Sequence, residues 1–180
     1  MALGAPFAST TIEDWEWITR VNYWGTIHGI GAFLPQMLER RSGHILITAS
    51  FLGFAGMPGA SAHTATKFAL VGLGEALRAE LAPQGIGVST LCPGTVDTRI
   101  VRDGRARLDA RGGVSRQGLE RFFKWFGRSP ERVAEAAVRA VKENPGVVPV
   151  GPDAWAAWLG KRASQRFYEW AVAQVGRRAL

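Results

Sequence analysis

Hydrophobic residues near the start of the chain recur at every third or fourth position, which is the spacing of one face of an α-helix. The pattern extends over residues 11–40, and Thr10 or Thr11 can cap its first turn. Pro35 lies inside this pattern, and we expect a bend there because proline removes a backbone donor. The first predicted element is therefore a long helix that buries one side.

Three short apolar runs show a different pattern, with β-branched residues and no helical spacing. Residues 44–50, 86–92 and 146–151 are each bounded by glycine or proline, so we predict three buried strands. Helix formers fill residues 61–81, between the first two strands, and this arrangement makes those strands parallel. The prediction is an α/β fold in which residues 1–180 form a single domain: a partial, doubly wound (Rossmann-like) parallel sheet of about three strands with flanking helices.

Two further segments surround this predicted sheet. Residues 99–128 are rich in arginine and glycine and too polar for a core element, so we expect a flexible flap. Residues 153–178 carry aromatic and aliphatic side chains along one side and cations toward the other. That pattern predicts a single amphipathic helix at the carboxyl end of the domain.

Composition narrows the class of protein. Of the 180 residues, 47% are hydrophobic, which is enough for one globular core. Cys92 is the only cysteine, so a disulfide within the chain and a cysteine-built metal site are excluded, and no metal is expected. No apolar run is long enough to cross a bilayer, and the first residues lack the basic region of a secretory signal. We therefore expect a cytoplasmic protein.

The formal charge of +7 raises the question of an anionic partner. Arginines are densest over residues 99–116, but no aromatic residues alternate with them and no recognition motif accompanies them. We therefore expect no nucleic-acid partner. The basic, tryptophan-rich helix at 153–178 suggests peripheral membrane contact, although packing on the core or on a partner subunit is the favoured interpretation.

Candidate chemistry gathers at one edge of the predicted sheet. Ser50 ends the first strand, and a turn over residues 93–98 follows the second. His63 and Lys67, four residues apart on one helix face, begin the helix between them. Ligands of open α/β sheets bind beyond the carboxyl ends of the strands, so these side chains form the candidate site.

The order and spacing of these residues resemble the short-chain dehydrogenase/reductase family. In that family a serine at a strand end is followed thirteen residues later by a tyrosine and four residues after that by a lysine. Ser50, position 63 and Lys67 have the same spacing, and "PGTVDT" from Pro93 to Thr98 is similar to the family's PG-motif. Asn22 in "VNYWGTIHG" matches the helix asparagine of the family's catalytic tetrad. The resemblance covers nearly the whole chain.

The resemblance implies an NAD(P)-dependent oxidoreductase that interconverts a small alcohol and a carbonyl compound by hydride transfer. The catalytic residues it implies are Ser50, His63, Lys67 and Asn22. The residues it assigns to the NAD or NADP cofactor are Lys67, Pro93, Gly94, Thr95, Val96 and Thr98. It also makes the segment 99–128 a flap over the substrate, and helices 11–40 and 61–81 the interface of a homo-oligomer.

Two departures from the family pattern weaken this expectation. His63 stands where the family has its proton-donating tyrosine. The Lys67 ammonium lowers the pKa of a neighbouring group, which activates a tyrosine but holds an imidazole neutral at pH 7 and makes it a poor acid. In addition, no G-x-x-x-G-x-G loop lies between a strand and a helix near the start of the chain, so the half that binds the cofactor phosphates is not recognised.

Two alternatives to an active enzyme therefore stay open. The chain could be a catalytically inactive, truncated remnant of the family that acts as a dimerisation or interaction module. In that case the outer edge of the strand at 44–50 would be exposed and prone to pair with another chain. A basic membrane-surface or nucleic-acid binder is the weaker alternative.

Overall fold

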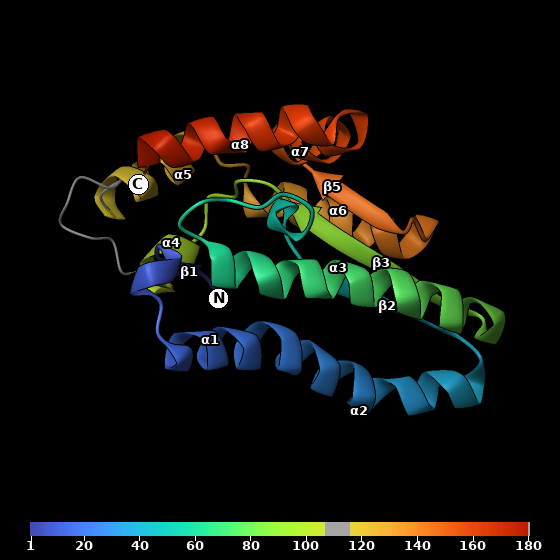
Figure 1. Cartoon of the computed structure of the whole chain (residues 1–180). Helices are drawn as coiled ribbons and strands as arrows, with labels where there is room; N and C mark the ends of the chain where they lie inside the picture. Colours follow the sequence, from blue (N-terminus) through green and yellow to red (C-terminus); the bar gives the residue numbers. More distant parts are fainter. Residues whose placement is uncertain (107–115, 180) are drawn as a thin grey trace.

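A parallel sheet of three strands forms the core of the computed structural model, which describes residues 1–106 and 116–179. In their order across the sheet the strands are β2 (Gly43–Thr48), β3 (Ile86–Pro93) and β5 (Val147–Val150). β2 pairs with β3 from Gly43 opposite Ile86 to Thr48 opposite Leu91. Both pairs of neighbouring strands run parallel (Figure 1), which confirms the predicted α/β fold with a Rossmann-like sheet.

Helices cover both faces of this sheet (Figure 1). α3 (Ser61–Leu81) lies on one face, where the Thr90 side chain of β3 packs directly beneath Gly74. α6 (Pro130–Glu143) lies on the other face, and there Ser89 Oγ donates to a carbonyl of α6 at 3.4 Å. Successive residues of a strand point to opposite faces of the sheet. Thr90 therefore faces α3, and its neighbour Ser89 faces α6.

The other elements surround the sheet. Two short strands, β1 (Leu3–Gly4) and β4 (Arg105–Ala106), form a separate parallel pair. Further α-helices are α1 (Ile12–Thr19), α2 (Gly25–Arg40), α4 (Ile100–Asp103), α5 (Arg116–Phe126), α7 (Pro152–Ala163) and α8 (Gln165–Ala179). Short 3₁₀ turns occupy Phe7–Ser9, Phe51–Gly53 and Ala82–Gln84. Among the described residues, no helix has the length and apolar character needed to cross a membrane.

The helix predicted over residues 11–40 is interrupted. A π-helical turn, Arg20–Trp24, separates α1 from α2, and α2 continues through Pro35. The prediction of one helix was wrong here because a π turn adds a single residue and leaves the apolar spacing almost unchanged. Thr11 is the cap: its side chain accepts a hydrogen bond from the Asp14 N–H at 3.3 Å.

The amphipathic helix predicted over residues 153–178 is in fact two helices. α7 and α8 are separated at Ser164, whose backbone is extended (φ −157°, ψ 107°). Ser164 Oγ accepts a hydrogen bond from the Phe167 N–H at 3.2 Å and so caps the start of α8. The prediction of a single helix was wrong because this serine begins a new helix inside an otherwise continuous apolar pattern.

The arginine-rich segment 99–128 contains two helices, α4 and α5, that the sequence pattern did not predict. α5 leaves Phe122, Trp125 and Phe126 exposed, so this segment contributes little to the core, as expected from its polarity. Residues 107–115 lie outside the described residues, and the flexibility of the flap stays a prediction.

Candidate active site

Ser50 lies immediately beyond the carboxyl end of β2, at the start of the Phe51–Gly53 turn. Its Oγ accepts a hydrogen bond from the Leu52 N–H at 3.2 Å. The Leu52 contact uses a lone pair of the hydroxyl and leaves the O–H free to donate. Ser50 is therefore an oriented hydroxyl donor at the edge of the sheet where ligands bind.

Lys67 reaches the same edge from the second turn of α3. Its Nζ donates to the Thr48 carbonyl, the last residue of β2, at 3.1 Å. Burial lowers the pKa of Lys67 to about 8. An ammonium group has three donors, so two remain for a ligand beyond the end of β2.

His63 lies one turn before Lys67 and is only 5% exposed. Burial lowers the pKa of His63 to about 4, and the Lys67 ammonium adds to the decrease. Both causes act in the direction expected from Lys67 alone, and burial is the larger of the two. His63 Nδ1 is buried without a hydrogen-bond partner among the described residues.

Asn22 is connected to the same helix through a residue that sequence reasoning missed. It lies in the π turn and is 7% exposed. Its Nδ2 donates to Thr66 Oγ1 at 3.2 Å, and Thr66 Oγ1 donates to the His63 carbonyl at 2.8 Å. The Asn22 amide also donates to the Met1 carbonyl at 3.2 Å. Asn22 and Thr66 thus fix the first turn of α3, and no motif in the sequence distinguished Thr66 from an ordinary helix residue.

Cys92 is a second residue that the sequence reasoning did not place in the site. It is fully buried near the carboxyl end of β3, where its side chain faces Lys67 and the Ser50 backbone. Burial raises the pKa of the Cys92 thiol to about 12, so the group stays protonated and uncharged. The sequence feature that could have placed Cys92 in the site is its position next to Pro93, at the end of the central strand.

The turn after β3 is held in place by α7. The Gly94 N–H donates to the Val150 carbonyl at 2.9 Å, and the Thr95 N–H donates to an Asp153 carboxylate oxygen at 2.6 Å. A Cβ atom on Gly94 would overlap the Asp153 carboxylate, so glycine is required for this close approach. Asp153 is thus a positioning residue that the sequence pattern did not reveal.

The rest of this turn leaves polar groups directed outward. The Arg128 N–H donates to the Thr95 carbonyl, and the Asp97 N–H donates to the Arg128 carbonyl, both at 2.9 Å. Arg128 thus pairs with the two residues on either side of Val96. The Val96 N–H points away from Arg128 and has no hydrogen-bond partner among the described residues. Thr98 Oγ1 accepts from the Ile100 N–H at 3.4 Å. Together with Lys67, these groups supply hydrogen-bonding atoms at this edge of the sheet.

The structure therefore brings Ser50, His63, Lys67 and Asn22 to one end of α3, and the turn from Pro93 to Thr98 to the same sheet edge. Within residues 1–106 and 116–179 there is no group of three or more His, Cys, Asp or Glu side chains that could hold a metal ion. Among the described residues, the chemistry available at this edge consists of hydrogen-bond donors, the amino groups of Lys67 and Met1, and the His63 imidazole.

The sequence matches known dehydrogenases. The profile of the short chain dehydrogenase family matches residues 1–109. The protein named probable oxidoreductase EphD, from Mycobacterium tuberculosis, is 32% identical over 161 residues, a region that covers 84% of this chain and 26% of EphD. This chain thus corresponds to about a quarter of that longer protein.

Solved structures have the same fold. A short-chain dehydrogenase from Streptomyces avermitilis has a TM-score of 0.78 and 29% identity, over 98% of this chain and 66% of that one. A short chain dehydrogenase/reductase from Burkholderia phymatum, solved in complex with NAD, has a TM-score of 0.75 and 27% identity, over 93% of this chain and 64% of that one. The chain spans less than two thirds of the length of each of these relatives. Because the family profile matches more than half of the sequence and the fold agrees, the chain belongs to the short-chain dehydrogenase family.

Proposed function

We propose that the chain provides the nicotinamide and substrate side of an NAD(P)-dependent oxidoreductase, which interconverts a small alcohol and a carbonyl compound by hydride transfer. One observation carries the proposal: Lys67 Nζ is held by the last carbonyl of β2, and the Ser50 hydroxyl follows two residues later at the same edge of the sheet. A cation and a neutral donor at the ligand-binding edge of a parallel sheet match the needs of this chemistry.

The cofactor contacts follow from the donors that remain free. Lys67 would hold the ribose hydroxyls of NAD or NADP with its two remaining N–H groups. The Val96 N–H and Thr98 Oγ1 would bind the carboxamide, on a turn whose shape depends on Pro93, Gly94 and Thr95. When bound, the nicotinamide supplies or accepts the hydride itself.

Ser50 and His63 would act on the substrate oxygen. Ser50 donates a hydrogen bond to this oxygen, where negative charge develops during reduction of a carbonyl. His63 stands at the position of the proton donor, but a neutral imidazole with a pKa of about 4 is rarely protonated at pH 7. We therefore expect slow reduction that accelerates as the pH falls, with Asn22 and Thr66 positioning the first turn of α3.

Titration with NADH and NADPH, followed through the fluorescence of the seven tryptophans, tests the cofactor site. We expect saturable binding that Lys67→Ala weakens about tenfold or more, because a charge-assisted hydrogen bond contributes about 1.5–3 kcal/mol. Lys142→Ala on the exposed side of α6 is the matched control and should bind as the unmodified chain does. Equal binding by the Lys67→Ala variant would contradict the proposal.

A second candidate function is an interaction module without catalysis. The observation that favours it is a row of small residues on the exposed side of α3, bordered by exposed Phe68, Glu75 and Glu80: Ala65, Ala69, Gly72, Ala76 and Ala79. Small side chains let another helix approach closely, so this face suits a homo-oligomer formed through α1, α2 and α3. The cofactor titration separates the two functions, because a module of this kind needs no NAD(P).

A further inference from the structure

The aromatic residues of α7 and α8 divide into an inner and an outer group. In the inner group, Trp158 and Tyr168 pack against the core of the sheet. The Tyr168 hydroxyl donates to the Gly56 carbonyl at 3.0 Å, and Lys161 Nζ lies over the Tyr168 ring, 5.5 Å from its centroid. These contacts hold both helices on the domain. Packing on the core, the interpretation favoured from the sequence, is therefore confirmed for the inner group.

The outer group does not pack in this way. Trp155 and Leu159 of α7, and Phe167 and Trp170 of α8, are between 46% and 60% exposed. The Phe167 and Trp170 rings stack on each other, with 5.8 Å between their centroids. Figure 1 shows α8 at the edge of the molecule, on the side opposite α1 and α2. We call these four residues the outer aromatic face, and exposed apolar side chains gathered in this way indicate a contact surface.

Arginine side chains accompany the outer aromatic face. Trp170 follows Arg166 by four residues and precedes Arg177 by seven, and these spacings place all three on one side of α8. Both arginines are exposed, so the apolar face is also cationic. Up to residue 177 the two helices carry more cations than anions: Lys161, Arg162, Arg166 and Arg177 against Asp153 and Glu169.

This combination of side chains narrows the class of partner. A second copy bound through the same face would place the arginines of both copies in one interface, and like charges there are unfavourable. Duplex DNA offers phosphates to the arginines but no apolar layer to Phe167 and Trp170. The surface of an anionic membrane offers both, because aromatic rings enter the headgroup region while arginines contact the lipid phosphates.

We propose that α7 and α8 dock the protein on the surface of a membrane that contains anionic lipids. Phe167 and Trp170 enter the headgroup region, and Arg166 and Arg177 bind lipid phosphates. The contact is peripheral, because no helix among the described residues could span a bilayer. Docking needs no cofactor and does not depend on the proposed function.

Two double variants remove the two kinds of contact separately. Phe167→Gln with Trp170→Gln removes the stacked rings, and Arg166→Gln with Arg177→Gln removes two charges. All four side chains are exposed, so neither double variant should unfold the domain. Thermal unfolding of each purified variant checks this.

Each double variant has a matched control on another part of the molecule. Trp24→Gln with Phe33→Gln also removes one exposed tryptophan and one exposed phenylalanine, from α2 and the residue directly before it. Figure 1 places α2 on the side opposite α8. Arg132→Gln with Arg139→Gln removes two exposed arginines from α6.

Flotation with lipid vesicles tests the proposal. The full chain is mixed with vesicles of equal parts phosphatidylcholine and phosphatidylserine, and in parallel with vesicles of phosphatidylcholine alone. We expect binding to the anionic vesicles that weakens as the salt concentration rises, and binding to the neutral vesicles that is weaker by about tenfold or more. Loss of the aromatic pair should weaken binding by about tenfold or more, and loss of each arginine by about fivefold. Both control variants should bind as the unmodified chain does.

Anionic vesicles with brominated acyl chains distinguish insertion from adsorption, because bromine quenches only those tryptophans that reach the bilayer. The unmodified chain should be quenched, and the variant without Phe167 and Trp170 should be quenched less. No binding to the anionic vesicles, binding without quenching, or equal binding by the aromatic pair variant and its control would each overturn the inference.

Two other occupants of the outer aromatic face would give different results. If the two double variants on α8 weaken binding to single-stranded or duplex DNA and leave vesicle binding unchanged, the face binds a nucleic acid and the inference is wrong. A dimer of the chain that only the aromatic pair variant dissociates, measured by light scattering, would likewise overturn it in favour of a second copy.

Discussion

At the scale of the residue, burial and the Lys67 ammonium act together on His63, the side chain at the proposed proton-donor position. Both groups lose a positive charge more easily than usual, because burial lowers the pKa of each and the Lys67 ammonium further lowers the pKa of His63. A tyrosine at position 63 would respond differently, because its acid form is neutral and the same ammonium would stabilise its phenolate. The environment of position 63 therefore favours a phenol over an imidazole.

The variant His63→Tyr should accordingly raise the rate of NADPH-dependent ketone reduction at pH 7. A well-placed general acid contributes about 10²–10⁴-fold, so we expect a gain of about 10²-fold or more. The measurement needs the chain in complex with, or fused to, a segment that carries the phosphate-binding loop. A rate no greater than that of the unmodified chain would show that position 63 does not supply the proton.

Burial of His63 also makes the stability of the fold depend on pH. The imidazole has a pKa of about 4 when folded and about 6.5 when unfolded, so between these values the unfolded chain binds more protons. The free energy of unfolding should therefore fall by about 3 kcal/mol as the pH decreases from 7 to 4. His63→Phe should remove most of this dependence in urea unfolding at pH 4 to 7.

A control for this pH experiment is His28→Phe, which removes an exposed imidazole on α2. The His28 variant should retain the dependence of the unmodified chain. If His63→Phe lost stability toward pH 4 as steeply as the unmodified chain does, a neutral, buried His63 would be ruled out as the cause.

At the scale of the element, the contact between α3 and β3 depends on one glycine. A Cβ at Gly74 would overlap Thr90 Oγ1, and both residues are buried. Gly74→Ala should therefore lower the free energy of unfolding by about 1–3 kcal/mol through overpacking. Chemical denaturation measures this loss, and adding Thr90→Ala should recover part of it because the hydroxyl is removed.

Gly72 provides the comparison on the same helix. A Cβ there meets nothing within 4 Å, and Gly72 is exposed. Gly72→Ala should stabilise the fold by about 0.5–1 kcal/mol because alanine is the better helix former. Loss of stability in both glycine variants, to the same extent, would mean that the α3–β3 contact is looser than the structure indicates.

The same elements show what the sequence could and could not predict. The helix at 61–81 was predicted with its observed ends because a glycine-rich loop precedes it and "APQG" follows it. The three strands were predicted because buried parallel strands are continuous apolar runs. The π turn at 20–24 and the break at Ser164 were missed, since each changes the backbone without interrupting the apolar spacing.

The sequence likewise identified some residues of the candidate site and missed others. Ser50, Lys67 and the Pro93–Thr98 turn were identified from their order along the chain, and the structure places all three at one sheet edge. Thr66 and Asp153 were missed because each acts through a contact between elements far apart in sequence. Their residue types are common, and only the three-dimensional arrangement distinguishes them.

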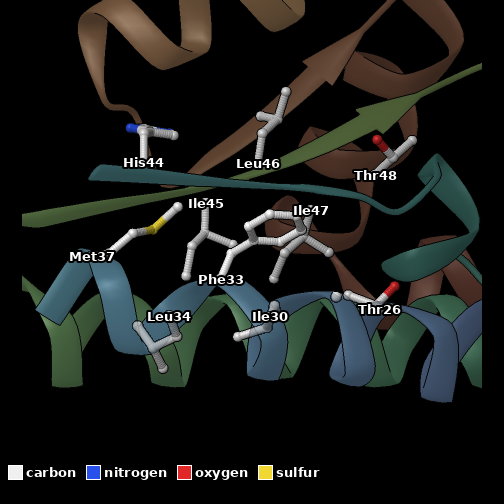
Figure 2. Close-up of a pocket in the computed structure, with 11 residues that line it drawn as sticks. Thr26, Ile30, Phe33, Leu34, Met37, His44, Ile45, Leu46, Ile47 and Thr48 are labelled. Carbon is white, nitrogen blue, oxygen red and sulfur yellow. The ribbon is translucent and has the colours of Figure 1, made fainter. Parts of the chain in front are cut away.

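At the scale of the whole molecule, two surfaces of different chemistry lie on the same side of the sheet. The pocket of about 400 Å³ between α2 and the outer edge of β2 has no Asp, Glu, Lys or Arg in its lining (Figure 2). The outer face of α3 carries small side chains bordered by Glu75 and Glu80. Small side chains let another helix approach closely, so of these two surfaces the α3 face is the one that suits the proposed assembly of two copies.

The proposed homo-oligomer, formed through the α3 face, gives the last prediction. A two-fold symmetric dimer uses the same face of both copies, so Ala69→Arg, in the middle of α3, would place two cations in one interface. Like charges juxtaposed in an interface cost several kcal/mol, so the dissociation constant should rise about 100-fold or more. Sedimentation equilibrium should then show monomers at concentrations where the unmodified chain is dimeric. Ala134→Arg, on the exposed side of α6, adds the same charge away from this face and should remain dimeric. If both variants dissociated alike, overall charge rather than the α3 face would control assembly.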